Sequence, residues 1–243
     1  MSEQGHAKNL EYFKTARGYA VSWGAKYAPS NQLLLEANLN SIIAAAEPAL
    51  DEVTDAKTPY RNATAAAQDA FDPLSELITR VINSLKSSGV AASVVEDAKT
   101  YSRKIKGQRK KPRPQDDPNS PDFDESPKAN SVSQMSRTQR IEFLDQLISL
   151  LESQVLYNPN EIDLKTTTLA ALSADLKAKV DAVQTTFIAL SNKRAARNAI
   201  FYAKGTGLVA VGNLFRSYVV SFGTKSPEWL QVKDLEFKVI GRK

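Results

Sequence analysis

A run of basic side chains is the part of this sequence best suited to hold a ligand. The run contains Lys99, Arg103, Lys104, Lys106, Arg109, Lys110, Lys111 and Arg113, with no acidic residue among them. Such a run can neutralise several phosphates of a nucleic acid. Aromatic side chains that would stack on bases are nearly absent, and five acidic residues follow within a dozen positions and would screen it. A solvated linker is therefore the favoured interpretation, with anion or nucleic-acid binding by Lys104, Lys106, Arg109, Lys110, Lys111 and Arg113 as the alternative.

Two further arginines, Arg194 and Arg197 in the stretch SNKRAARN, continue the apolar stripe of a predicted helix. Long arginine side chains can bury their aliphatic stems while the charged ends stay in water. Packing at the end of a helix is thus the default role of this pair. A clamp for a carboxylate or a phosphate is the alternative.

The residue types in this chain give little support for a catalytic function. The chain has no cysteine and a single histidine, His6, in a polar N-terminal stretch that we expect to be mobile. Asp116, Asp117, Asp122, Asp124 and Glu125 lack the spacing of a calcium-binding loop, and KGTG lacks the pattern of a phosphate-binding loop. No pair of carboxylates stands out as buried. We predict no catalytic residue, no metal site and no cofactor, and hence no enzyme.

The chain repeats itself at an offset of 130 residues. Without a gap, Tyr27 aligns with Tyr157, Leu34 with Leu164 and Leu39 with Leu169, and further identities follow as far as Asn83 and Asn213. A repeat at one long period predicts two copies of a single folding unit.

Apolar residues within each copy recur three and four positions apart, as they do on one face of a helix. The faces include Phe13, Ala16, Ala20, Trp23 and Tyr27; Leu39, Ile42, Ala46, Leu50, Val53 and Tyr60; Ile141, Leu144, Ile148, Leu151 and Val155; and Leu169, Leu172, Leu176, Val180, Val183, Phe187 and Leu190. Thr58-Pro59, Asp72-Pro73 and KGTG predict helix breaks or kinks, and Pro48 predicts a bend. Leu235, Phe237 and Val239 alternate and predict an extended end.

Residues 107–137 are rich in proline and charge and poor in apolar side chains, which predicts a linker. The predicted fold class is all-α. It consists of two tandem antiparallel helical bundles, residues 9–106 and 138–243, joined by this Pro-rich linker, with little or no strand.

The stretch from Ser131 to Asn198 contains SVSQMS, then FLDQLISLL, YNPNE, LAALSADLKAK and ALSNKRAARN. In these letters it resembles an uncharacterised bacterial family of tandem helical-repeat proteins. The resemblance implies a helical fold and no assigned activity, substrate or functional residue.

Two functions from different classes remain open. The preferred hypothesis is a non-enzymatic scaffold or protein-interaction module that presents two similar helical units to a protein partner. The alternative is an anion or nucleic-acid binder that uses the basic run. The sequence shows neither a secretory signal nor a stretch of about 18 apolar residues, so we predict no membrane span and a cytoplasmic location.

Overall fold

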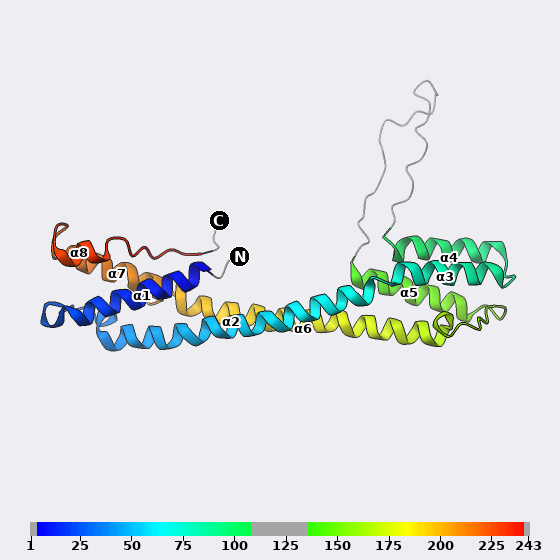
Figure 1. Cartoon of the computed structure of the whole chain (residues 1–243), viewed down its shortest axis with the longest axis horizontal. Coiled ribbons are helices and arrows are strands. Elements are labelled where there is room, and N and C mark those ends of the chain that lie inside the picture. Colours follow the sequence, from blue (N-terminus) through cyan, green and yellow to red (C-terminus); the bar gives the residue numbers. More distant parts are fainter. Residues whose placement is uncertain (1–3, 108–135, 241–243) are drawn as a thin grey trace, which may run out of the picture. The chain divides into compact units, whose positions relative to one another are not determined.

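The structure is a computed structural model that describes residues 4–107 and 136–240. Its elements are α1 (Gln4–Ser22), η1 (Gly24–Lys26), η2 (Gln32–Leu34), α2 (Glu36–Phe71), α3 (Leu74–Ser87), α4 (Ala92–Ile105), α5 (Arg137–Glu152), η3 (Ile162–Leu164), α6 (Thr166–Tyr202), α7 (Leu208–Val220) and α8 (Pro227–Val232). No strand occurs in these two ranges, so the all-helical prediction is confirmed (Figure 1). No helix within them is both long and apolar enough to span a membrane.

The chain divides into two compact units, and each unit takes residues from both ends of the sequence. Unit 1 comprises residues 1–61 and 186–243, and unit 2 comprises residues 62–185. The boundaries fall inside α2 and α6, so each of these long helices contributes to both units. This division differs from the expected bundles 9–106 and 138–243. Each expected bundle instead supplies part of both units.

The core of unit 1 joins α1 and the first part of α2 to the end of α6, α7 and the C-terminal segment. Its fully buried members include Phe13, Leu39, Phe201 and Phe215. Burying aromatic and aliphatic side chains of this size provides the main stabilising free energy of a helical unit. Helices α1 and α7 lie side by side in this unit (Figure 1).

The core of unit 2 joins the end of α2, α3 and α4 to α5 and the beginning of α6. Ile78, Leu85, Ile105 and Leu144 are among its fully buried side chains. Helix α4 packs against both α3 and α5 (Figure 1). Four of the five apolar positions expected on α5 are buried. The fifth, Val155, is 95% exposed because the helix ends three residues earlier, at Glu152.

The predicted helix breaks are partly right. Helix α3 begins directly after Asp72-Pro73, and the KGTG stretch separates α6 from α7. No new helix starts at Thr58-Pro59, because α2 runs through both Pro48 and Pro59, so of the break or kink expected there the break is wrong. Residues 54–66 of α2 and 177–189 of α6 contain no buried residue, and Phe187 is 50% exposed beside Tyr60 although the pattern placed both on buried faces.

The two ends of the described chain meet in unit 1. His6 lies in α1 with 2% of its surface exposed and packs against Phe201 and Tyr202, so the expected mobile tail is wrong at this residue. Asn9 Nδ2 donates to the Lys238 carbonyl over 2.8 Å, and the Lys238 N–H donates to Asn9 Oδ1 over 3.2 Å. The segment after α8 is extended, as the alternation predicts, with Leu235 and Phe237 buried and Val239 half exposed.

Candidate functional site

The structure places the predicted basic residues in different surroundings. Lys104 lies with its Nζ 4.6 Å from the centre of the Phe143 ring, whereas Lys106 donates from Nζ to the Thr79 hydroxyl over 2.7 Å. Both residues stand at the C-terminal end of α4, where positive charge is favoured by the helix dipole. Arg109, Lys110, Lys111 and Arg113 lie outside the described residues, as does most of the predicted linker.

The arginine pair on α6 is not part of this basic end. Arg197 is 4% exposed and donates from Nε and Nη2 to Asn198 Oδ1, over 3.2 and 2.9 Å. Arg194 is partly buried. Both lie in unit 1, whereas Lys104 and Lys106 lie in unit 2. The burial of Arg197 agrees with the packing role.

Two arginines of α5 add positive charge near the end of α4. Arg137 and Arg140 place their guanidinium carbons 5.9 and 5.0 Å from the centre of the Phe71 ring. Arg140 Nε also donates to the Ile105 carbonyl over 2.7 Å. Burial, followed by repulsion from Arg137, lowers the pKa of Arg140 below its ordinary value. The apolar spacing predicts only the buried face of α5, so it gives no indication of this arginine pair.

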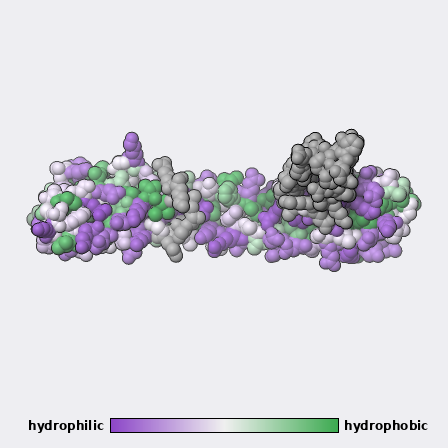
Figure 2. All heavy atoms as spheres, turned by 90° about the horizontal axis from the view of Figure 1, so that it is seen from above, coloured by the Kyte–Doolittle hydropathy of each residue, from purple (hydrophilic) through white to green (hydrophobic). Residues whose placement is uncertain are grey.

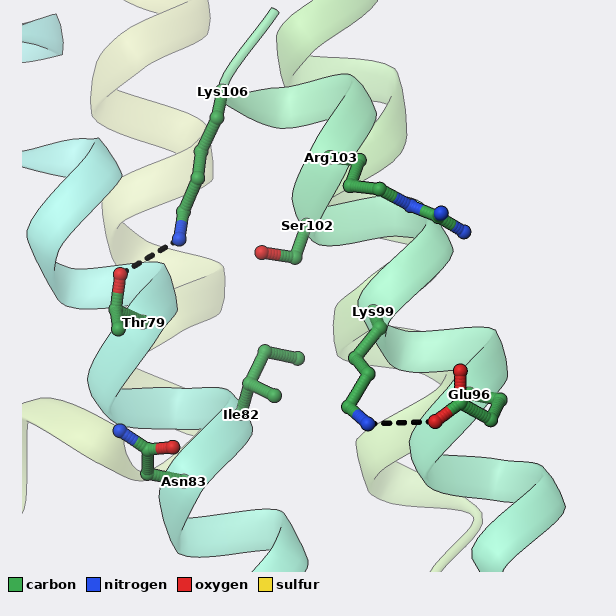
Figure 3. Close-up of a pocket in the computed structure, with 8 residues that line it drawn as sticks. All are labelled: Thr79, Ile82, Asn83, Glu96, Lys99, Ser102, Arg103 and Lys106. Atoms are coloured by element: carbon green, nitrogen blue, oxygen red, sulfur yellow. Dashed lines mark hydrogen bonds and ion pairs between the residues drawn. The ribbon is translucent and has the colours of Figure 1, made fainter. Parts of the chain in front are cut away.

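A groove of about 280 Å³ lies between α3 and α4 (Figure 3). It is lined by Thr79, Ile82 and Asn83 of α3 and by Glu96, Lys99, Ser102, Arg103 and Lys106 of α4. The floor is formed by Ile82 and Ser102, which are 8% and 7% exposed. The other six residues stand around it.

Hydrogen bonds orient most of the charged side chains in this groove. Lys106 reaches across to α3, while Arg103 points away from α3 and donates to the Thr100 hydroxyl over 2.9 Å (Figure 3). Lys99 Nζ donates to Glu96 over 2.6 Å, and this hydrogen bond and the lysine charge lower the pKa of the Glu96 carboxyl. With three cations and one carboxylate, the lining carries a formal charge of +2 (3 minus 1).

Among the described residues, two polar side chains of this lining make no hydrogen bond, the Asn83 amide and the Ser102 hydroxyl. The Ser102 oxygen points toward α3, into the space between the two helices (Figure 3). Serine on a helix usually satisfies its hydroxyl by bonding a carbonyl one turn earlier or by facing water. Ser102 as a whole is 7% exposed, but its hydroxyl oxygen is not sealed from water, so the groove keeps it accessible.

A second surface feature of unit 2 is the loop between α5 and α6, here named the apolar loop, residues 153–165. Val155, Leu156 and Ile162 are 95%, 60% and 75% exposed. Two interactions fix the loop: the Tyr157 hydroxyl donates to the Leu164 carbonyl over 2.8 Å, and Arg80 of α3 pairs with Asp163. Glu152 and Glu161, both exposed, flank Val155 and Leu156 in the sequence, and Ile162 directly follows Glu161.

Polar and apolar residues are interspersed over the face of each unit seen in Figure 2. Within residues 4–107 and 136–240, no group of three or more His, Cys, Asp or Glu side chains is arranged to hold a metal ion.

No protein-family model, curated protein sequence or solved structure matches this chain. The resemblance to a family of tandem helical-repeat proteins therefore stays a prediction. The groove and the apolar loop must be interpreted from their own chemistry.

Proposed function

We propose that this chain is a non-enzymatic protein-interaction module that docks onto a protein partner through the apolar loop. The supporting observation is the exposure of Val155, Leu156 and Ile162 on a loop held by Tyr157 and by the Arg80–Asp163 ion pair. Large aliphatic side chains fixed in water gain free energy when a partner covers them. A preorganised loop also loses little conformational entropy on binding.

Charge defines the kind of partner. Glu152 and Glu161 are close in sequence to the aliphatic side chains, and Lys165 is the one basic residue of the loop itself. A partner with a small apolar pocket bordered by lysine or arginine would match both features. The interaction is then centred on the aliphatic residues, with the carboxylates setting its specificity and its salt dependence.

The module is further proposed to have arisen by internal duplication, as the sequence repeat predicts. Ile162–Leu164 follows Gln32–Leu34 by 130 residues (162 minus 32), and α6 begins 130 residues after α2 (166 minus 36). The Tyr27 hydroxyl donates to the Leu34 carbonyl as Tyr157 does to Leu164. At the positions of Val155, Leu156 and Ile162, however, the first copy has Ala25, Lys26 and Gln32. Docking is thus assigned to unit 2 alone.

A triple substitution tests the proposal. In the full chain, Val155→Ser, Leu156→Ser and Ile162→Ser remove the aliphatic surface without changing charge. The matched control is Val21→Ser, Leu230→Ser and Val239→Ser in unit 1, where the side chains are 45%, 52% and 50% exposed. Proteins captured from lysate by the wild type are identified, and the affinity of each purified candidate is measured by calorimetry.

We expect the loop variant to bind its partner at least about tenfold more weakly than the wild type, since a few buried anchors dominate most interfaces. The control should bind as the wild type does. The proposal is wrong if both triple variants retain wild-type affinity for every purified candidate.

The second candidate function, binding of nucleic acid by the basic run, is favoured by Arg140, which donates to the Ile105 carbonyl at the end of α4, and by Arg137, which lies against the same Phe71 ring as Arg140. Affinity for a nucleic acid would fall steeply with salt concentration, because counterions are released on binding. An apolar contact through the loop would be much less sensitive to salt.

A further inference from the structure

We propose that the groove between α3 and α4 is a binding site for a small phosphate group, either inorganic phosphate or a phosphate monoester. This site is separate from the apolar loop and does not depend on the proposed function. It shares Lys99, Arg103 and Lys106 with the basic run, but its donors come from both α3 and α4 and include neutral groups.

Lys106 provides the charge at the centre of the site. Its ammonium group has three N–H donors, and one of them is used to reach the Thr79 hydroxyl. The Thr79 hydroxyl in turn donates to the Ser75 carbonyl over 2.9 Å, so its own hydrogen is already bonded. Thr79 therefore acts as a positioning residue that holds the ammonium over the groove, leaving two N–H donors for an anion.

Ser102 provides the neutral donor beneath this charge. Its hydroxyl points into the groove from a side chain that is 7% exposed and makes no other side-chain hydrogen bond in the described ranges. This hydroxyl remains accessible to water in the groove, so a bound acceptor can replace that water as its hydrogen-bond partner. A phosphate oxygen is an acceptor without a competing donor, and so fits a site lined by donors.

The remaining lining residues favour an anion of limited size. The Asn83 amide can donate, and Lys99 and Arg103 stand at the outer rim on α4. The only carboxylate of the lining, Glu96, is bonded to Lys99, which reduces its repulsion of an incoming anion. A volume of about 280 Å³ is at the low end for ligand sites, which matches one phosphate group and a short attachment.

The test is a titration of the full chain, labelled with ¹⁵N, with inorganic phosphate, phosphoserine and a short single-stranded DNA at low ionic strength. Amide shifts of residues 79, 83, 102 and 106 report on the groove. Three variants are compared: Ser102→Ala, Lys106→Met and Lys86→Met. Lys86 is an exposed lysine of α3 outside the groove, so its substitution removes the same charge from the same unit.

We expect both phosphate compounds to shift the groove amides with saturation. Lys106→Met should weaken binding about tenfold, as loss of a charged hydrogen bond does. Ser102→Ala, which leaves the charge unchanged, should weaken it several-fold. Lys86→Met should leave the affinity at the wild-type value.

Three outcomes would overturn the proposal. One is the absence of saturable shifts in the groove. Another is an equal loss of affinity in Lys106→Met and Lys86→Met, which would mean general attraction by surface charge. The third is binding of the DNA without binding of either phosphate compound, which would support the nucleic-acid alternative instead. Thermal unfolding of each variant verifies that it is folded.

Discussion

Two tyrosines show how one side chain fixes a turn in this chain. Tyr27 and Tyr157 each donate a hydroxyl hydrogen bond to the carbonyl seven residues later, at Leu34 and Leu164. Both rings are at least partly buried, and burial raises the pKa of Tyr157 to about 12 and that of Tyr27 above its ordinary value. The neutral, hydrogen-bonded form is therefore the one that the folded chain favours.

This burial makes folding stability depend on alkaline pH. Between the ordinary pKa of 10.0 and the folded value of about 12, the unfolded chain loses the Tyr157 proton while the folded chain keeps it. The free energy of unfolding therefore falls as pH rises through this window. We expect Tyr157→Phe to cost about 1 kcal/mol at neutral pH, from the lost hydrogen bond, and to show a shallower decline above pH 10.

Urea unfolding of the wild type and Tyr157→Phe at about pH 8, 10 and 11 measures both effects. Tyr27→Phe is the matched variant, because its hydroxyl makes the same bond in unit 1. An identical decline in the wild type and Tyr157→Phe would contradict the argument.

Individual side chains were harder to predict than the pattern to which they belong. Val155 continues the apolar spacing of α5 but lies beyond the last residue of that helix, so it is exposed. His6 precedes the first strong apolar position but faces Phe201, nearly two hundred residues away. The Lys106–Thr79 contact also joins two helices, and nothing in the spacing within either helix indicates it. The local pattern predicts which face of a helix a residue occupies, but it does not predict which distant residue that face contacts.

At the scale of elements, the two prolines inside α2 are the unexpected feature. Proline lacks an N–H donor and its ring crowds the preceding turn, so a helix interior normally resists it. Pro48 and Pro59 are both exposed, and the long helix is stabilised by packing at both of its ends, through Leu39 and Ala46 in unit 1 and Phe71 in unit 2. Tertiary packing overrides the local preference for a break. The sequence alone gives no measure of that packing.

Replacing these exposed prolines should strengthen the helix. We expect Pro48→Ala and Pro59→Ala each to raise the free energy of unfolding by about 1–3 kcal/mol, because a hydrogen bond is restored and no packed surface is lost. Pro73→Ala is the control, since Pro73 precedes α3 at a position that tolerates proline. Chemical unfolding followed by circular dichroism gives the three values. Equal effects at all three positions would show that the prolines act mainly through the unfolded chain.

At the scale of the whole molecule, the repeat predicts helices well and predicts their assembly poorly. Period located α1, α2, α5 and α6, and punctuation located the starts of α3 and α7, because amphipathic faces and turn residues are local properties. These local properties do not predict which helix faces pack against each other. The core of unit 1 combines Phe13 with Phe215, and that of unit 2 combines Ile78 with Leu144. Each core therefore draws on both sides of residues 108–135.

This arrangement has a direct consequence for a divided chain. Residues 1–107 alone would leave the apolar faces of α1 and α4 without the α7 and α5 residues that cover them, and residues 136–243 alone would leave the faces of α7 and α5 uncovered. Uncovered faces of this size favour aggregation or pairing. We expect neither fragment to unfold cooperatively as a monomer. The two fragments mixed together should regain the helical signal and the melting transition of the intact chain.

Cleavage of the intact chain at a protease site inserted within residues 108–135 provides the complementary measurement. Both cores contain residues from before and after the cleavage site. The two pieces should therefore stay together in gel filtration and separate only in denaturant. A cut between units 1 and 2 cannot be made in the same way, since α2 and α6 each belong to both. If the cleaved pieces separated under native conditions, each as a folded monomer with its own transition, residues 9–106 and 138–243 would be independent bundles and the mixed cores would be wrong.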